Sequence, residues 1–406
     1  MCGFTWPIPP TCRSTPDRFQ STLLTIDCCI IGGGIIGLSI ARELAGRGCR
    51  VRLLAREPRR QTSSWAAAGI LPPAPLPNQP DPKAALTALS DRLHWQWAAE
   101  LRAETGIDNG LRRCGGVYLA RDASGLESLH VEADRWRGQG VTCAWLDRQE
   151  LLAAEPGLAT AVVEGRITGG FLLPEEARIR PPWQLDALER SCLARGVSLG
   201  HSAAVERVEV AGGRVTGLGV RGERGTETVA ADCYVLAAGA WSGGLAGQFG
   251  LRLDTRPIRG QIALVRFSGQ PLGHVVNLGL DYLVPREDGR VLVGSTLEDS
   301  GFDPVTVPAT IEALLAMASE LLGDLSTAVV ERAWAGLRPG SVDGLPTIGP
   351  VPGYDNAFVA TGHFRAGIHQ SPGTAVIVAD LVEGKSPPVE ITAFAPDRAS
   401  GSCGQR

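Results

Sequence analysis

The sequence predicts a protein of two parts, an α/β part with a parallel sheet and an α+β part with a mostly antiparallel sheet. Glycines at 32, 34 and 37 separate an apolar run typical of a buried strand from a run with helical periodicity. Between Arg256 and Trp334, short strands of alternating polarity replace this pattern. The length of 406 residues suits two domains.

The N-terminal elements form a β-α-β unit. Leu23–Ile31 predicts a buried strand, Ile35–Arg47 a helix that ends at Gly48, and Arg50–Leu54 a second strand. The glycines between the first strand and the helix fit a dinucleotide site. The first permits a tight turn, the second lets the backbone approach a pyrophosphate, and the third allows close packing of helix on strand.

The remaining elements follow from periodicity and from Gly and Pro signals. We expect helices at Asp91–Thr105, Leu126–Gly138, Arg148–Ala154, Pro182–Arg195, Thr310–Leu322 and Gly373–Glu383, and an irregular proline-rich loop at Pro72–Pro82. We expect strands at Val117–Ala120, Tyr234–Ala238, Ile262–Phe267, Tyr282–Pro285, Arg290–Gly294 and Ala357–Ala360, and a hairpin of Val205–Val210 with Arg214–Val220. From Ala335 the chain is glycine-rich.

The composition excludes several functions. The net charge of −4 indicates neither a nucleic acid nor a membrane as partner. The two lysines, Lys83 and Lys385, lie in proline-containing loops, which argues against a Schiff-base enzyme. None of the ten cysteines has zinc-site spacing, so we expect reduced thiols, no metal and a cytoplasmic protein. Residues 1–22 lack the apolar core of a secretory signal.

The second strand departs from the dinucleotide fingerprint. That strand ordinarily ends in Asp or Glu, which binds the adenosine ribose, but Ala55 stands there. Either Glu57 reaches back or the rest of the cofactor is held well enough without an acid. Alternatively, Arg56 marks a 2′-phosphate and therefore NADP.

Four further blocks carry a family resemblance. They are WAAAGI (65–70), YLVPREDGRVLVGST (282–296), AGLRPGSVDGLPTIGP (335–350) and TGHFRAGI (361–368). Together with the glycine motif they resemble the D-amino-acid oxidase superfamily of FAD-dependent amine oxidases. Within it they are most similar to the glycine oxidases of thiazole formation in thiamine biosynthesis. The resemblance covers the chain from about residue 26 to about residue 385.

The resemblance implies a Rossmann-like FAD-binding domain built from discontinuous segments, and a substrate domain with an antiparallel sheet. We expect the FAD-binding domain at 23–88, 165–255 and 336–395, the substrate domain at 89–164 and 256–335, and a flexible leader (1–22) and tail (396–406). Some relatives attach flavin covalently to a cysteine just before the C-terminal arginine–proline region. Since Ala333–Leu337 contains no cysteine, we expect non-covalent FAD.

The resemblance also implies site residues. The cofactor positions that match the family are Gly32, Gly34, Ile35, Ile36, Gly37, Ala55, Arg56, Ser63, Ser64, Ala68, Gly69, Ile70, Val205, His363, Phe364, Arg365, Ala366, Gly367, Ile368 and His369. Arg338, Arg365 and Tyr282 match the substrate-binding positions.

The chemistry of the residues supports these substrate-binding roles, because a planar guanidinium binds a carboxylate through two hydrogen bonds. We expect Arg338 in a turn bounded by Gly and Pro, and Arg365 in a glycine-flanked loop. A structural ion pair, or strand packing for Tyr282, remains the alternative. We expect Ile70, Leu280 and Leu297 to line the pocket, and no catalytic side chain, since FAD carries the chemistry. His274, His363 and His369 are then structural.

The function implied is oxidative deamination of glycine or a similar small amino acid. Hydride passes from Cα to the flavin, an imine forms and O2 is reduced to H2O2. The iminoacetate produced from glycine would supply thiazole synthesis. The alternatives are a sarcosine or D-amino-acid oxidase, a dehydrogenase of the same fold, and a catalytically weak relative that binds FAD poorly. A homo-oligomer is compatible with each of these.

Overall fold

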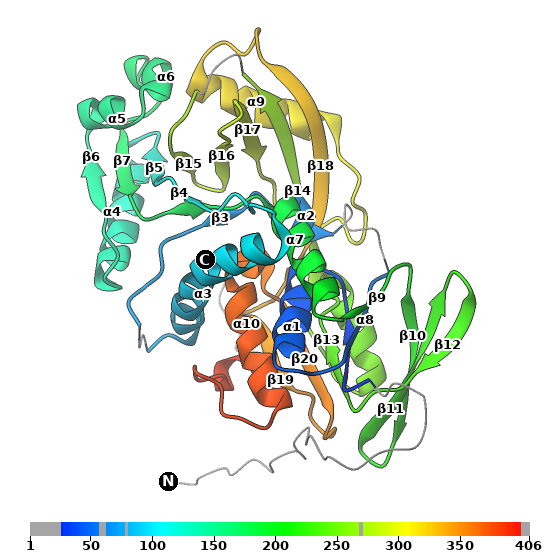
Figure 1. Ribbon diagram of the computed structural model, residues 1–406. Helices are drawn as coiled ribbons and strands as arrows, with labels where there is room; N and C mark the ends of the chain where they lie inside the picture. Colours follow the sequence, from blue (N-terminus) through cyan, green and yellow to red (C-terminus); the bar gives the residue numbers. More distant parts are fainter. Residues whose placement is uncertain (1–25, 57–61, 78–79, 268–270, 399–406) are drawn as a thin grey trace. The chain divides into compact units, whose positions relative to one another are not determined.

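The structure is a computed structural model that describes residues 26–56, 62–77, 80–267 and 271–398 (Figure 1). Its chain divides into two compact units. The first unit comprises Met1–Thr62, Leu185–Arg256 and Pro339–Arg406, and the second comprises Ser63–Gln184 and Pro257–Arg338. Residues 63–88 and 165–184, which the sequence analysis placed with the FAD-binding segments, lie in the second unit. The functional names of the domains stay predictions.

The first unit contains the predicted parallel sheet. Its strand order is β19 (Thr347–Pro350), β20 (Ala357–Thr361), β13 (Cys233–Leu236), β1 (Cys28–Ile31), β2 (Val51–Leu54) and β9 (Ser198–Gly200). Only β19 runs antiparallel to its neighbour in this sheet. The crossover order around β1 is that of a doubly wound α/β sheet, whose ligands bind beyond the carboxyl ends of the strands.

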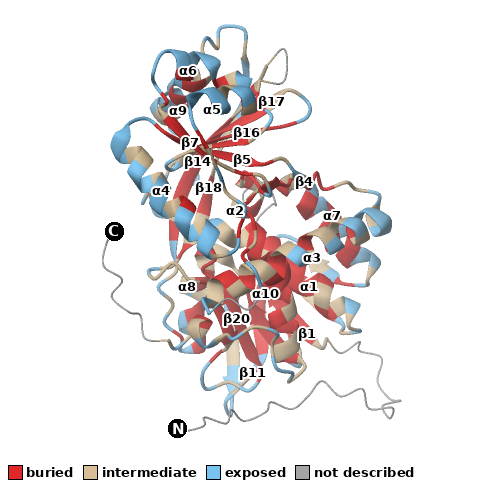
Figure 2. Ribbon diagram, turned by 90° about the vertical axis from the view of Figure 1, so that its left-hand side faces the viewer, coloured by how far each residue is buried: buried red, intermediate tan, exposed pale blue. Residues whose placement is uncertain are grey.

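The central strand β1 is buried along its whole length (Figure 2). Cys28 and Cys29 have no exposed surface, and Cys28 lies opposite Cys233 of β13 in the parallel register. Helix α1 (Ile35–Gly46) follows β1 and packs against α10 (Gly367–Val382). Gly48, at a φ of 91°, follows α1 as predicted. The N-terminal β-α-β prediction is therefore confirmed in the described residues.

A three-stranded antiparallel sheet completes the first unit. It consists of β10 (Ala204–Ala211), β11 (Arg214–Gly222) and β12 (Gly225–Val229), and its first two strands form the predicted hairpin. Leu218 and Val220 of β11 share a hydrophobic cluster with Tyr234 of β13 and with Phe249. This cluster fixes β10, and with it Val205, to the parallel sheet.

The second unit is built on a large sheet of eight strands. Their order is β18 (Val329–Gly340), β14 (Arg256–Arg266), β17 (Arg290–Gly294), β16 (Asp281–Pro285), β15 (Val275–Leu278), β5 (Gly116–Ala120), β7 (Gly169–Leu173) and β6 (Ala144–Leu146). The pair β15–β5 is parallel, whereas β14–β17, β17–β16, β16–β15, β5–β7 and β7–β6 are antiparallel. The predicted change to a mostly antiparallel sheet is confirmed.

The two faces of this sheet have different neighbours. Ala263 and Val265 of β14 belong to the larger cluster, which also contains Leu151 and Leu314 from α5 (Arg148–Ala154) and α9 (Pro308–Leu322). Because side chains alternate along a strand, Ile262 points to the opposite face. There it packs with the cluster of Tyr282, Val284, Leu292 and Ala68. We call this second side the open face of the sheet, since α5 and α9 do not cover it.

The two units contain further helices and one small sheet. They are α2 (Ser63–Ala66), α3 (Pro82–Thr105), α4 (Ala123–Gly138), α6 (Ala159–Val163), α7 (Pro181–Ala194), α8 (Ser242–Ala246) and a three-stranded sheet in the order β3 (Ile70–Leu71), β8 (Ala177–Arg178), β4 (Arg112–Arg113). Within the described ranges, no helix is both long enough and apolar enough to span a membrane.

Two predicted helix starts and one predicted turn are wrong. Helix α3 begins at Pro82, nine residues early, because Asp81 caps it by accepting from the Lys83 amide and proline is favoured at the first helical position. Helix α10 begins at Gly367 and contains Pro372. The glycine-rich stretch after Ala335 is not a turn, because it is the end of strand β18. Arg338 therefore lies on a strand, held by the neighbouring β14.

Candidate functional site

The glycine motif of the first unit makes a turn that only glycine can form. Gly32 has a φ of 123°, and a Cβ at this position would lie 2.2 Å from the carbonyl oxygen of Ala237, the residue after β13. A Cβ on Gly37 would lie 1.9 Å from the Gly32 carbonyl oxygen. Helix α1 therefore begins directly against the strand end. Both glycines have the roles predicted from the sequence.

The start of α1 suits a bound anion. Gly34 is the N-cap and makes no side-chain capping bond. The first amides of a helix have no acceptor within the helix, and the helix dipole makes this end positive. These two properties suit the pyrophosphate of a dinucleotide, with Ile35 and Ile36 in the first turn.

The end of β2 holds Ala55 in backbone hydrogen bonds and places Arg56 on a tryptophan ring. The Ala55 amide donates to the Gly200 carbonyl at 2.8 Å, and the Ala55 carbonyl accepts from the Ala203 amide at 2.9 Å. The Arg56 guanidinium lies over the Trp241 ring, 4.7 Å from its centroid. The alternative in which Glu57 reaches back falls outside the described residues.

The loop at 361–369 forms a short 3-10 turn and the first turn of α10. Phe364 has a φ of 48°, an unusual value for a residue with a side chain. His363 is buried and its Nε2 lies 3.0 Å from Thr374 Oγ1. Burial lowers the pKa of His363 to about 3, so its ring is neutral. Among the described residues, His363 Nδ1 has no hydrogen-bond partner. An orphaned buried nitrogen fits a polar atom of a bound cofactor.

In the second unit, the loop of residues 63–70 packs on strand β18. The Trp334 indole donates to the Ala66 carbonyl at 3.1 Å. A Cβ on Gly336 would lie 2.6 Å from the Ala66 Cβ, so the loop backbone meets the strand directly. Ser64, Ala66, Ala68 and the glycine after it are buried. Apart from Trp65 and Ile70, this segment consists of Ser, Ala and Gly.

Arg338 lies at the end of β18 in the second unit. Its Nη2 donates to Ser295 Oγ at 2.8 Å and its Nη1 to the Thr296 carbonyl at 3.0 Å. A Cβ on Gly260 would lie 2.0 Å from Nη1, so the guanidinium rests on the bare backbone of β14. Both of these acceptors are uncharged, and together they fix the plane of the guanidinium.

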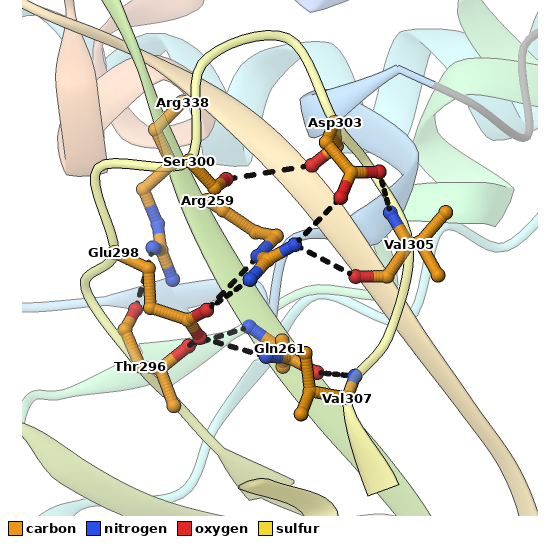
Figure 3. A network of polar contacts seen from close by, with 9 residues as sticks. All are labelled: Arg259, Gln261, Thr296, Glu298, Ser300, Asp303, Val305, Val307 and Arg338. Atoms are coloured by element: carbon orange, nitrogen blue, oxygen red, sulfur yellow. Dashed lines mark hydrogen bonds and ion pairs between the residues drawn. The ribbon is translucent and has the colours of Figure 1, made fainter.

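A polar network fixes the segment to which Arg338 is bonded (Figure 3). Glu298 accepts from Thr296 Oγ1, and from Gln261 Nε2 at 2.7 Å. Arg259 of β14 donates to Glu298 at 2.6 Å and to the Val305 carbonyl at 3.1 Å. Hydrogen bonds from Thr296, Gln261 and Arg259 hold the pKa of Glu298 below its usual value against the opposing effect of burial. The carboxylate therefore stays charged.

Tyr282 lies on the neighbouring strand β16. It is 7% exposed and pairs in register with Gly294, the residue before Ser295. A Cβ on Gly294 would lie 2.8 Å from the Tyr282 ring. Tyr282 therefore lies beside the strand end that leads to Ser295 and Thr296, the two residues that accept from Arg338. Its role in substrate binding stays a prediction.

The other sequence predictions have mixed outcomes. Arg365 lies in the first unit and is exposed. Leu280 and Leu297, predicted as pocket walls, are 54% and 39% exposed, and nothing in their exposure supports that role. The sequence analysis missed Ser295, Thr296 and Gly260. The first two belong to the block at 282–296 on which the family resemblance rests, so a signal was present there.

His274 has a structural contact, in agreement with its predicted role. Its Nδ1 lies 3.0 Å from Glu155 Oε2, and the same oxygen accepts from the His274 amide at 2.8 Å. Glu155 is buried and also accepts from the Gly273 amide. The pair fixes the start of β15.

Comparison with known proteins gives a consistent result. A family model for FAD dependent oxidoreductases (DAO) matches residues 27–381. The chain belongs to this family. It is 36% identical to glycine oxidase of Pseudomonas aeruginosa over 377 residues, or 90% of this chain and 97% of that protein. It is 35% identical to the bifunctional protein ThiO/ThiG of Trichormus variabilis, covering 90% of this chain and 54% of that protein.

A solved structure agrees with the DAO family assignment. The crystal structure of glycine oxidase from Geobacillus kaustophilus matches with a TM-score of 0.86 and 33% identity, over 92% of this chain and 99% of that one. The chain is therefore an FAD-dependent oxidoreductase with the predicted fold. FAD is its cofactor, so Arg56 does not mark NADP. The glycine turn, the start of α1 and the orphaned His363 nitrogen fit this cofactor.

Proposed function

We propose that this enzyme oxidises glycine or a similarly small amino acid with O2, and that Arg338 binds the substrate carboxylate. The observation that carries the proposal is the position of the Arg338 guanidinium. It is fixed by Ser295 and Thr296 and lies over the bare backbone of Gly260. A planar guanidinium held in this way suits bidentate binding of a carboxylate.

A second residue, Tyr282, supports a carboxylate site at Arg338. Tyr282 and Gly294 lie on the same sheet face, and the tyrosine hydroxyl can donate to the second side of a bound carboxylate. When bound, FAD accepts two electrons from the substrate carbon, the chemistry that a protein leaves to its cofactor. Arg338 and Tyr282 orient the substrate for that transfer. The predicted role of Arg365 in substrate binding and the non-covalent attachment of FAD belong to this proposal.

The proposed product is an imine, which from glycine is iminoacetate, and H2O2 forms from O2. The resemblance to glycine oxidases and to a ThiO/ThiG protein supports a role in supplying thiazole synthesis during thiamine formation. We also propose a cytoplasmic location, with an amino acid and O2 as the partners.

An anaerobic titration tests the proposal. Glycine is added without O2 while the flavin absorbance is recorded, and air is then admitted. We expect glycine to bleach the flavin and air to restore it with formation of peroxide. Bleaching by sarcosine or D-alanine alone would change the substrate class. Bleaching that air does not reverse would indicate a dehydrogenase, and a protein that takes up no FAD would indicate a weak relative.

A further inference from the structure

The second unit contains a pocket whose lining includes none of the proposed substrate-binding residues Arg338, Arg365 and Tyr282. Its volume is about 330 Å³ and it lies on the open face of the large sheet. Leu264 of β14 and Leu292 of β17 form its apolar floor, and Trp65 and Trp334 form one wall. All residues that line it belong to the second unit. The pocket can therefore be described without reference to the first unit.

The tryptophan wall is a fixed surface. The two indole rings meet edge to face, with centroids 5.6 Å apart and planes at 62°. The Trp334 ring is held by its hydrogen bond to the Ala66 carbonyl. A flat apolar group can pack against such a wall with little loss of side-chain freedom.

The rest of the lining is strongly basic. Arg180, Arg286, Arg290 and Arg332 line the pocket together with a single acid, Glu331. This acid is already shared, since it accepts from Arg290 at 2.6 Å and also from Arg266 outside the pocket. Arginine side chains in a confined space attract an anion, and the low polarity of the wall strengthens that attraction.

Arg286 has no neutralising acid. Its Nη2 donates to the Ala68 carbonyl at 2.7 Å and its Nη1 to the Ile179 carbonyl at 3.2 Å. In the described part of the chain, no carboxylate lies within ion-pair distance of it. Burial, followed by the charges of Arg180 and Arg178, lowers the pKa of Arg286 to about 9. The group is still charged at neutral pH, and a bound anion would offset the repulsion from Arg180 and Arg178.

The neighbouring acids leave an excess of positive charge. Asp288 accepts from Arg180 at 3.0 Å and from Arg290 at 2.9 Å, so one carboxylate serves two guanidinium groups. Arg332 is exposed and has no ion pair among the described residues. Arg286 and Arg332 thus both line the pocket without a carboxylate partner among the described residues.

We propose that this pocket binds an organic phosphate monoester with a flat apolar body. The dianionic head group would contact Arg286 and Arg332, and the flat body would pack against Trp65 and Trp334. The pocket is separate from the carboxylate site, because Arg338 stands four residues beyond Trp334, about 13 Å along β18. This proposal is independent of the proposed substrate.

The test is a calorimetric titration of the FAD-loaded enzyme with phenyl phosphate at low ionic strength. We expect one molecule to bind per chain, inorganic phosphate to bind more weakly and phenol not to bind. Arg332→Glu should weaken phenyl phosphate by tenfold or more, because it replaces a charge-assisted contact by repulsion. The exposed Arg92 of α3, outside the pocket, gives the matched control Arg92→Glu, which should leave the affinity within about twofold.

Three results would overturn the proposal. One is the absence of binding heat with phenyl phosphate. Another is an equal loss of affinity in Arg332→Glu and Arg92→Glu, which would indicate general charge attraction. The third is loss of phenyl phosphate binding in Arg338→Met, which would place the ligand in the carboxylate site. The visible spectrum of the flavin is recorded in the same samples and shows whether FAD is retained. Weaker phenyl phosphate binding can then be distinguished from an effect of FAD release.

Discussion

Arg338 donates to the backbone carbonyl of Thr296 at 3.0 Å, from the end of β18 to the segment that follows β17. The chain between these two residues contains α9. The position of the guanidinium therefore depends on a contact that no local sequence pattern contains. Changes to Arg338, or to Glu298, which accepts from Thr296, should therefore both affect the proposed substrate site.

Replacing Arg338 by alanine should abolish glycine oxidation and keep FAD bound. The loss of a bidentate charge-assisted pair should reduce kcat/KM by at least about a hundredfold. The kcat/KM of Arg338→Lys should fall between those of the wild type and Arg338→Ala, since an ammonium keeps the charge but not the planar, two-pronged geometry of the guanidinium. Steady-state kinetics and the flavin absorbance of each variant measure this. Release of FAD from Arg338→Ala would instead make this arginine structural.

Glu298→Gln should change substrate binding although Glu298 is bonded to Thr296 and not to Arg338. The neutral amide loses its ion pair with Arg259, 2.6 Å away, so the segment that holds Arg338 loosens. We expect KM for glycine to rise by about threefold to tenfold with kcat nearly unchanged. The control is Glu320→Gln, which removes an exposed ion pair with Arg121 in the same unit. A lower Tm with unaltered KM in Glu298→Gln would contradict a positioning role.

Ala55→Glu should tighten FAD binding. A carboxylate at the end of β2 can accept hydrogen bonds from the adenosine ribose, and such a charge-assisted bond is worth about tenfold in Kd or more. Ala55→Gln is the matched control, because the amide has the same size without the charge and should gain less. The Kd is measured by titrating the apoprotein with FAD. An unchanged or raised Kd for the glutamate variant would contradict this role of residue 55.

Glu176 should make stability fall as the pH rises from about 4.5 to about 7. Burial raises its pKa to about 7, although Tyr118 donates to it at 2.7 Å and Asn277 at 3.3 Å. The folded state then holds a proton that the unfolded state has lost, between about pH 4.5 and 7, and stability decreases with pH across that window. The total effect is on the order of 3 kcal/mol.

Thermal unfolding of the wild type and of Glu176→Gln between pH 5 and 8 measures that slope. The glutamine variant cannot titrate, so the difference in Tm between the two proteins should shift in its favour as the pH rises. Parallel curves would show that this carboxyl keeps an ordinary pKa.

The local structure around the glycine motif could be predicted from the sequence. The turn at Gly32 and helix α1 depend on residues next to one another, and glycine is required there by a positive φ and a backbone contact. The strand that carries Arg338 was missed because Gly and Pro near it suggested a turn. Its pairing with β14 becomes visible only in three dimensions. Ser295 and Gly260 were missed for the same reason, because both acquire their role through Arg338.

The buried cysteines of the central sheet have a consequence for the proposed reaction, which would generate peroxide. Burial raises the pKa of the Cys29 thiol to about 12, and a hydrogen bond with Cys233 together with burial raises that of Cys28. Peroxide oxidises the thiolate, a form that these residues therefore scarcely adopt. If the proposed reaction releases H2O2, the protein's own core resists damage by its product.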